Sequence, residues 1–121
     1  MKKYIYLLIL KGVTMMIKIE ITPLAKQRIQ ESLGDKPGVI KLIYDTEGCG
    51  CDGINRLLIQ PESGKFDTPI DASPFTFVVD QQHQIFYEDK LKLDAEENYP
   101  VFKLSSDSST YSTNVSIQDL R

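Results

Sequence analysis

Residues 39–60 have the sequence VIKLIYDTEGCGCDGINRLLIQ, and this stretch contains the clearest strand pattern of the chain. Val39–Tyr44 and Ile54–Gln60 are rich in aliphatic residues with a period of two, which predicts two well-buried strands. The polar segment between them contains three glycines, which is typical of a turn. The only two cysteines of the chain, Cys49 and Cys51, therefore lie in a strand-to-strand connection.

The flanking sequence predicts one helix and several short strands. Ile17–Ile21 alternates strictly between apolar and polar residues, as a half-buried strand does. Thr22 and Pro23 begin a helix, because threonine caps free amides and proline suits the first helical position, and Gly34 ends it. Further strands are predicted at Phe75–Asp80, Gln84–Tyr87, Lys90–Asp94, Pro100–Leu104 and Asn114–Gln118, separated by turn-rich residues 61–64 and 71–74 and a loop at 105–113. The pattern predicts an α+β fold, a β-rich sandwich or barrel-like domain with one N-terminal helix.

The composition limits the class of protein. A chain of 121 residues with 41% hydrophobic residues can form one domain with its own core. Fourteen basic and seventeen acidic residues give a net charge of -3 without any block of like charge, so nucleic acid and membrane are not expected partners. Two cysteines are too few for a secreted disulfide framework, which favours the reducing cytoplasm.

The N-terminus is interpreted separately. Residues 1–16 are expected to be an extension, or to precede a natural start at Met15 or Met16, and the domain itself is expected to span 17–121. Lys2 and Lys3 followed by the apolar run Tyr4–Leu10 imitate a signal peptide, but the run is too short and no cleavage site follows. If ordered, it is expected to form an added edge strand or an oligomer contact.

Cys49 and Cys51 are the candidate functional residues. Glycine on either side of Cys49 lets the chain turn both thiols the same way, and a tetrahedral metal-thiolate site needs sulfurs about 3.8 Å apart. The alternative is that two small, semi-apolar side chains pack under the connection. Two thiolates fill half of a tetrahedral site, so the other ligands would come from another protomer, a partner protein, small thiols, or oxygen and nitrogen donors.

The other candidates have simpler interpretations. Asp45, Glu47 and Asp52 form a solvated acidic loop, since the ligand spacing of a calcium loop is absent. His83, the sole histidine, lies in a polar turn and is expected to be a surface residue. The sequence has no phosphate loop, nucleophile elbow or paired-histidine motif, so the protein is not expected to be an enzyme.

Several segments resemble the HesB-like iron-sulfur cluster biosynthesis family of A-type carriers. They are Ile19–Ala25 with the helix after it, Lys41–Tyr44, Gly48–Cys51, Phe77–Asp80 and Phe102–Ser106. The resemblance covers residue 17 to the C-terminus and implies a compact β-rich fold that binds iron or a small cluster through three cysteines. One of these lies in the loop that matches Gly48–Cys51, and the other two form a C-terminal Cys-Gly-Cys. Residues 105–121 contain no cysteine, so the chain resembles a divergent member.

The resemblance implies a role in iron-sulfur cluster assembly, with iron or a cluster bound through Cys49 and Cys51. A homodimer would supply the four thiolates of a [2Fe-2S] centre, and cluster-assembly or acceptor proteins would be partners. The alternative is an interaction module that keeps the fold, binds no metal and has redox-sensitive thiols.

Overall fold

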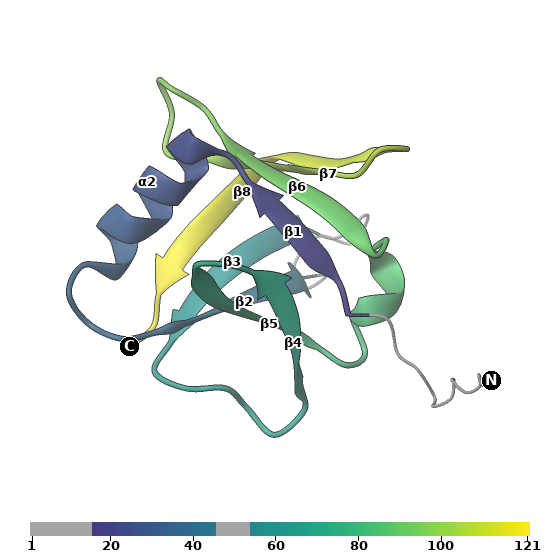
Figure 1. Ribbon diagram of the computed structural model, residues 1–121, viewed down its shortest axis with the longest axis horizontal. Helices are drawn as coiled ribbons and strands as arrows, with labels where there is room; N and C mark the ends of the chain where they lie inside the picture. Colours follow the sequence, from purple (N-terminus) through teal and green to yellow (C-terminus); the bar gives the residue numbers. More distant parts are fainter. Residues whose placement is uncertain (1–15, 46–53) are drawn as a thin grey trace.

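The computed structural model describes residues 16–45 and 54–121, and these form a closed β-barrel with one helix beside it (Figure 1). The strands are β1 (Lys18–Ile21), β2 (Val39–Asp45), β3 (Ile54–Gln60), β4 (Asp67–Ala72), β5 (Phe75–Asp80), β6 (Lys90–Ala95), β7 (Phe102–Ser105) and β8 (Thr110–Asp119). Their order around the barrel is β1-β4-β5-β2-β3-β8-β7-β6. The predicted β-rich, barrel-like fold with one N-terminal helix is confirmed.

The core lies inside the barrel, and every strand contributes to it. Period-two alternation turns apolar side chains inward, as in β3, where Leu57 and Ile59 are 1% and 0% exposed. The helix α2 (Pro23–Leu33) lies along one side and contacts β6 and β8 (Figure 1). It buries Ala25 and Ile29 against the same core.

The ends of α2 are those the sequence predicts. The amide of Ala25 donates to Oγ1 of Thr22 at 3.3 Å, so the threonine is the N-cap. Gly34 follows the last turn with a φ of 64°, a conformation that residues with a Cβ adopt at a cost.

The predicted strand at Gln84–Tyr87 is wrong. Residues Gln84–Phe86 form a short 3-10 helix, η1, which follows β5 after a turn at residues 81–83. The chain turns at this point because Asp80 accepts hydrogen bonds from the next residues, from the Gln82 amide to its side chain and from the His83 amide to its carbonyl. The apolar pair Ile85 and Phe86 suggests a strand in the sequence, yet both side chains are exposed.

Strand β4 was not predicted, because its sequence DTPIDA contains a proline and few apolar residues. It pairs with β5 over its whole length, whereas its other edge pairs with β1 at a single residue, Asp71. Pro69 lacks an amide hydrogen and is tolerated at such a weakly paired edge. Strand β8 also begins at Thr110 rather than Asn114, so the second half of the predicted loop at 105–113 is strand.

Three features predicted from the sequence fall wholly or partly outside the described residues. They are the N-terminal extension, of which only Met16 is described, the cysteine pair, and the acidic side chains between β2 and β3. Neither α2 nor η1, the helices of the described ranges, is long and apolar enough to cross a membrane.

A buried ion pair ties β2 to β4 across β5. Nζ of Lys41 lies 2.9 Å from Oδ1 of Asp67, whose side chain is 1% exposed, and the amide of Gly64 donates to Oδ2 of Asp67 at 2.6 Å. Burial alone would raise the pKa of the Asp67 carboxyl, but the hydrogen bonds from Lys41 and Gly64 and the charge of Lys41 lower it. The carboxylate is therefore stable as a charged group inside the fold.

We expect Asp67→Asn to lower the free energy of unfolding by about 2 kcal/mol at pH 7, because it leaves the mostly buried Lys41 ammonium without its partner. A carboxyl with a depressed folded-state pKa stabilises the fold above its unfolded pKa of about 3.9, and this contribution is lost as pH falls through the folded value. Urea unfolding should therefore show a smaller difference in the free energy of unfolding between the wild type and Asp67→Asn at pH 3 than at pH 7. Asp80→Asn is the matched control, since Oδ2 of Asp80 is 4.0 Å from the ammonium and more exposed. An equal loss in both variants would contradict the assignment.

Candidate functional site

The candidate site is the end of the barrel at which β2 leads into β3. The two strands are antiparallel, and their last described pair is Asp45 with Ile54. The segment 46–53, which carries Cys49 and Cys51, lies outside the described residues, and the residues on either side of it, Asp45 and Ile54, are paired. Strand β8 runs parallel to β3, with Arg56 opposite Ser116, so the first half of β8 is at the same end of the barrel.

The helix η1 and the residue after it pack across this end. The Phe86 ring lies 4.6 Å from the Tyr44 ring, between centroids, and the hydroxyl of Tyr87 donates to Oδ1 of Asn55 at 2.5 Å. The Tyr111 ring meets the Tyr87 ring edge-on at 5.4 Å. Asn55 is 4% exposed, and the Tyr87 hydroxyl satisfies its amide oxygen.

The phenol of Tyr87 is a structural donor. Burial, followed by the charges of Tyr111 and Tyr44, raises the pKa of Tyr87 above its ordinary value. The hydroxyl therefore stays protonated and keeps its hydrogen bond to Asn55. A phenolate that could bind iron or act as a base is disfavoured here.

The structure places His83 against Tyr44 at this end of the barrel, whereas its polar turn in the sequence predicts only a surface residue. The amide of Tyr44 donates to Nδ1 of His83 at 3.4 Å, and the imidazole ring lies 6.0 Å from the Phe86 ring. In a neutral imidazole whose Nδ1 accepts a hydrogen bond, the proton is on Nε2. A metal-binding histidine uses one nitrogen as ligand and donates through the other. His83 instead accepts a hydrogen bond through Nδ1 and carries its proton on Nε2, which favours a structural role.

Glu88 contributes a fixed carboxylate beside η1. Its side chain accepts hydrogen bonds from the hydroxyls of Ser106 and Ser108, and its amide donates to the Tyr111 hydroxyl at 2.9 Å. These serine hydrogen bonds, that of Ser106 first, lower the pKa of the Glu88 carboxyl. The carboxylate ties the turn between β7 and β8 to the start of β6.

The described residues do not complete a metal site. Within residues 16–45 and 54–121, no three side chains of histidine, cysteine, aspartate or glutamate converge in a way that could hold an ion. A metal site with three or more such ligands at this end would therefore need at least one ligand from outside the described residues. The aromatic residues Tyr44, Tyr87 and Tyr111 were missed as a group, because they are distant in sequence and Tyr111 lies in the predicted loop.

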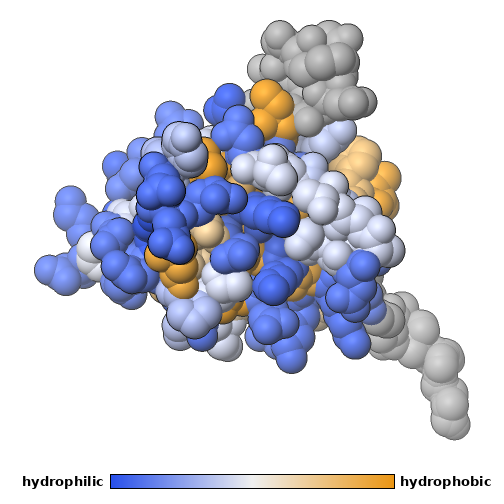
Figure 2. Space-filling model, turned by 90° about the horizontal axis from the view of Figure 1, so that it is seen from above, coloured by the Kyte–Doolittle hydropathy of each residue, from blue (hydrophilic) through white to orange (hydrophobic). Residues whose placement is uncertain are grey.

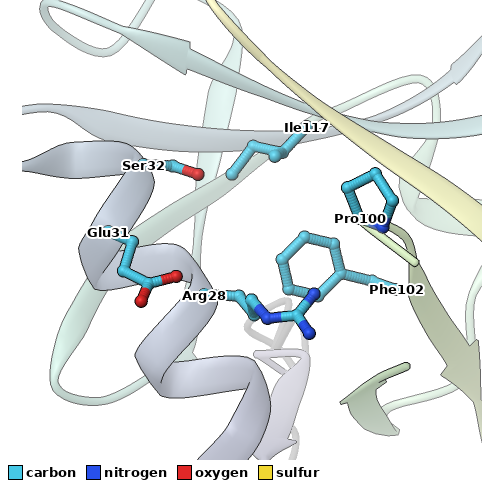
Figure 3. Close-up of a pocket in the computed structure, with 6 residues that line it drawn as sticks. All are labelled: Arg28, Glu31, Ser32, Pro100, Phe102 and Ile117. Carbon is cyan, nitrogen blue, oxygen red and sulfur yellow. The ribbon is translucent and has the colours of Figure 1, made fainter. Parts of the chain in front are cut away.

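A separate cavity lies between α2 and the barrel (Figure 3). It has a volume of about 240 Å³ and is lined by Arg28, Glu31, Ser32, Pro100, Phe102 and Ile117. The guanidinium of Arg28 donates to the carbonyls of Glu97 and Tyr99 and so holds the connection before β7. None of these lining residues belongs to β2, β3 or η1.

Solved structures share this fold. The chain superposes with a TM-score of 0.69 on a Lactobacillus salivarius protein assigned to Fe-S biosynthesis, at 23% identity, covering 87% of this chain and 99% of that one. Another such protein, from Lactobacillus acidophilus, gives a TM-score of 0.70 at 14% identity, covering 85% and 90%. Escherichia coli SufA, which is involved in the biosynthesis of iron-sulfur clusters, gives 0.60 at 19% identity, covering 82% and 94%.

Sequence comparison gives the family. The chain is 26% identical over 104 residues to the uncharacterized protein YqkB of Bacillus subtilis, which covers 84% of this chain and 97% of that protein. Residues 17–119 match the model of the iron-sulphur cluster biosynthesis family, which is nearly all of the barrel and its helix. The resemblance to HesB-like proteins is thus confirmed over residues 17–119, and the protein belongs to the iron-sulphur cluster biosynthesis family.

Proposed function

We propose that this protein takes part in iron-sulfur cluster assembly by binding iron or a small cluster through Cys49 and Cys51 and passing it on. Family membership supports the pathway. The observation that carries the proposal is the pairing of Asp45 with Ile54, which holds both ends of the cysteine-bearing segment at one end of a rigid barrel. Cys49 and Cys51 are one residue apart in the sequence, which favours joint binding of a soft metal by their thiolates.

One chain has too few thiolates for a cluster, so the proposed cluster is shared between two chains. One chain supplies two thiolates, whereas a [2Fe-2S] cluster is held by four. Within residues 16–45 and 54–121 no three histidine, cysteine, aspartate or glutamate side chains converge, and the contacts of His83 argue against its use as a ligand. A symmetric dimer with two such segments facing each other would supply four thiolates from identical surfaces.

The protein acts without catalysing a reaction, in the reducing cytoplasm, where thiolates remain available for metal. Its partners are cluster-assembly or acceptor proteins. A net charge of -3 disfavours nucleic acid and anionic membranes as partners.

A second function is favoured by one observation, the absence of cysteine from residues 105–121. Without those ligands the chain could be an interaction module that keeps the barrel, binds no metal and carries two redox-sensitive thiols. The two functions differ in whether iron and sulfide generate an absorbing species on the protein.

Anaerobic reconstitution with iron and sulfide should give thiolate-to-iron charge-transfer absorption, and Cys49→Ser and Cys51→Ser should each abolish it, because both sulfurs are ligands. His83→Gln is the control. It removes the imidazole but, under the structural role inferred above, leaves the spectrum unchanged. Identical visible spectra for the wild type and both cysteine variants would rule out the cysteine-ligand proposal. Loss of the spectrum in His83→Gln would show that the histidine is a ligand.

Loading and self-association should also be linked. A cluster held between two chains stabilises the dimer by mass action, so the loaded protein should be dimeric at concentrations at which the metal-free protein is more dissociated. Anaerobic sedimentation equilibrium measures both states, and Cys51→Ser should remove the difference. A loaded protein that remains monomeric would refute sharing and point to small thiols or a heterologous partner.

A further inference from the structure

One edge of β1 is paired only at its start. Its register with β4 is a single pair, Lys18 with Asp71, and the Asp71 amide donates to the Ile17 carbonyl at 2.9 Å. Strand β4 ends one residue later, at Ala72, so among the described residues the rest of β1 has no strand opposite it on this side. The other edge is fully paired, since β6 lies alongside β1 from Lys18 to Ile21 (Figure 1). An unpaired strand edge is a template for another strand.

Two backbone groups of β1 face this open edge. The amides of Lys18 and Thr22 donate at 2.8 and 3.0 Å to carbonyls just before and within β6, so the even-numbered residues bond to β6. In a parallel sheet alternate residues bond to opposite neighbours, so Ile19 and Ile21 direct their backbone groups away from β6. The Ile19 carbonyl and the Ile21 amide lie beyond the pair with Asp71. The sheet register of the described residues gives neither group a partner.

A groove of about 470 Å³ lies at this edge. It is lined by residues 18–21 of β1, by Asp71 and Ser73, and by Lys26 of α2. Its charged side chains are two lysines and two carboxylates, which disfavours a uniformly anionic ligand such as nucleic acid or phosphate. Figure 2 views from above the side on which β6 and β7 lie in Figure 1, and that surface is mostly hydrophilic. The specific feature of the groove is therefore its main-chain donor and acceptor.

This donor and acceptor match the main chain of an extended peptide. One residue beside Glu20 would donate its amide hydrogen to the Ile19 carbonyl and accept from the Ile21 amide, as in a parallel sheet. Side chains alternate along a strand, so the residues before and after it would point to the same side as Ile19 and Ile21, whose side chains belong to the core. Apolar residues suit those two positions.

A second copy of this chain is a poorer occupant. A two-fold axis that paired the same backbone groups of two copies would be centred on Glu20. It would place Glu20 of one copy directly opposite Glu20 of the other, and like charges in that position are destabilising.

We propose that this groove binds an extended peptide segment of a partner protein by strand addition, through the Ile19 carbonyl and the Ile21 amide. The segment has apolar residues on both sides of an uncharged polar residue, because that central residue lies beside charges of both signs. The site goes beyond the proposed function. It uses neither Cys49 nor Cys51, so either proposal can fail without the other.

The probe is the capped peptide acetyl-TVTVT-amide, titrated into the isotopically labelled full chain and followed through the backbone amide signals in NMR spectra. Binding should move the Ile21 amide signal, since this amide gains a hydrogen bond. The same peptide N-methylated at its central threonine should bind roughly tenfold more weakly, because it lacks the hydrogen that bonds to the Ile19 carbonyl.

A pair of variants tests the location. Ser73→Tyr places a large side chain at an exposed position that lines the groove, and it should weaken binding of the probe by roughly tenfold. Ser63→Tyr is the matched control, since Ser63 is an exposed serine before β4 that does not line the groove, and it should bind as the wild type does. The dispersion of the amide signals verifies that both variants fold, and the N-methylated peptide tests the same bond without any variant.

Four results would overturn the proposal. The probe leaves the Ile21 signal unmoved at millimolar concentration, the N-methylated peptide binds equally well, or Ser73→Tyr binds as Ser63→Tyr does. The fourth is an Ile21 signal that moves with protein concentration in the absence of peptide, which would identify a second copy as the occupant. Charge-transfer absorption after reconstitution reports separately on the cysteines and should be the same in Ser73→Tyr and the wild type.

Discussion

Closure of the barrel depends on β1, a strand of four residues that pairs on both of its edges. It runs parallel to β6 from Lys18 to Ile21 and meets β4 at Asp71, whose amide donates to the carbonyl of Ile17 at 2.9 Å. Without this strand, β4 and β6 would each have an open edge. The next residue, Thr22, caps α2 and donates its hydroxyl hydrogen to Asp94 of β6 at 2.8 Å, so one short segment both closes the sheet and positions the helix.

The sequence was most informative where one physical rule determined the structure. Ile40, Leu42, Leu57 and Ile59 alternate because their strands have one face in the core, and both strands were predicted. Prediction failed where tertiary pairing outweighed local preference. Pro69 lies in a strand because only one edge of β4 is fully paired, and the Ser- and Thr-rich start of β8 is strand because β7 pairs with it.

The site shows the same division. Two thiols one residue apart are visible in any reading of the sequence, and so is their place between two strands. The side chains that pack at this end of the barrel cannot be predicted from the sequence. Tyr44, His83, Tyr87 and Tyr111 come from three separate regions of the chain and meet only when the barrel closes. The exposed apolar pair on η1 was predicted as a strand, because side-chain polarity alone does not tell buried apolar residues from exposed ones.

The aromatic packing at this end has a spectroscopic consequence. The chain contains six tyrosines and no tryptophan, so its ultraviolet emission comes from tyrosine alone. Tyr44, Tyr87 and Tyr111 lie at the end of the barrel where β2 leads into β3, whereas Tyr99 is 66% exposed in the turn before β7. Half of the intrinsic fluorophores thus report on events beside the cysteine segment, and the protein carries its own optical probe of that end without a label.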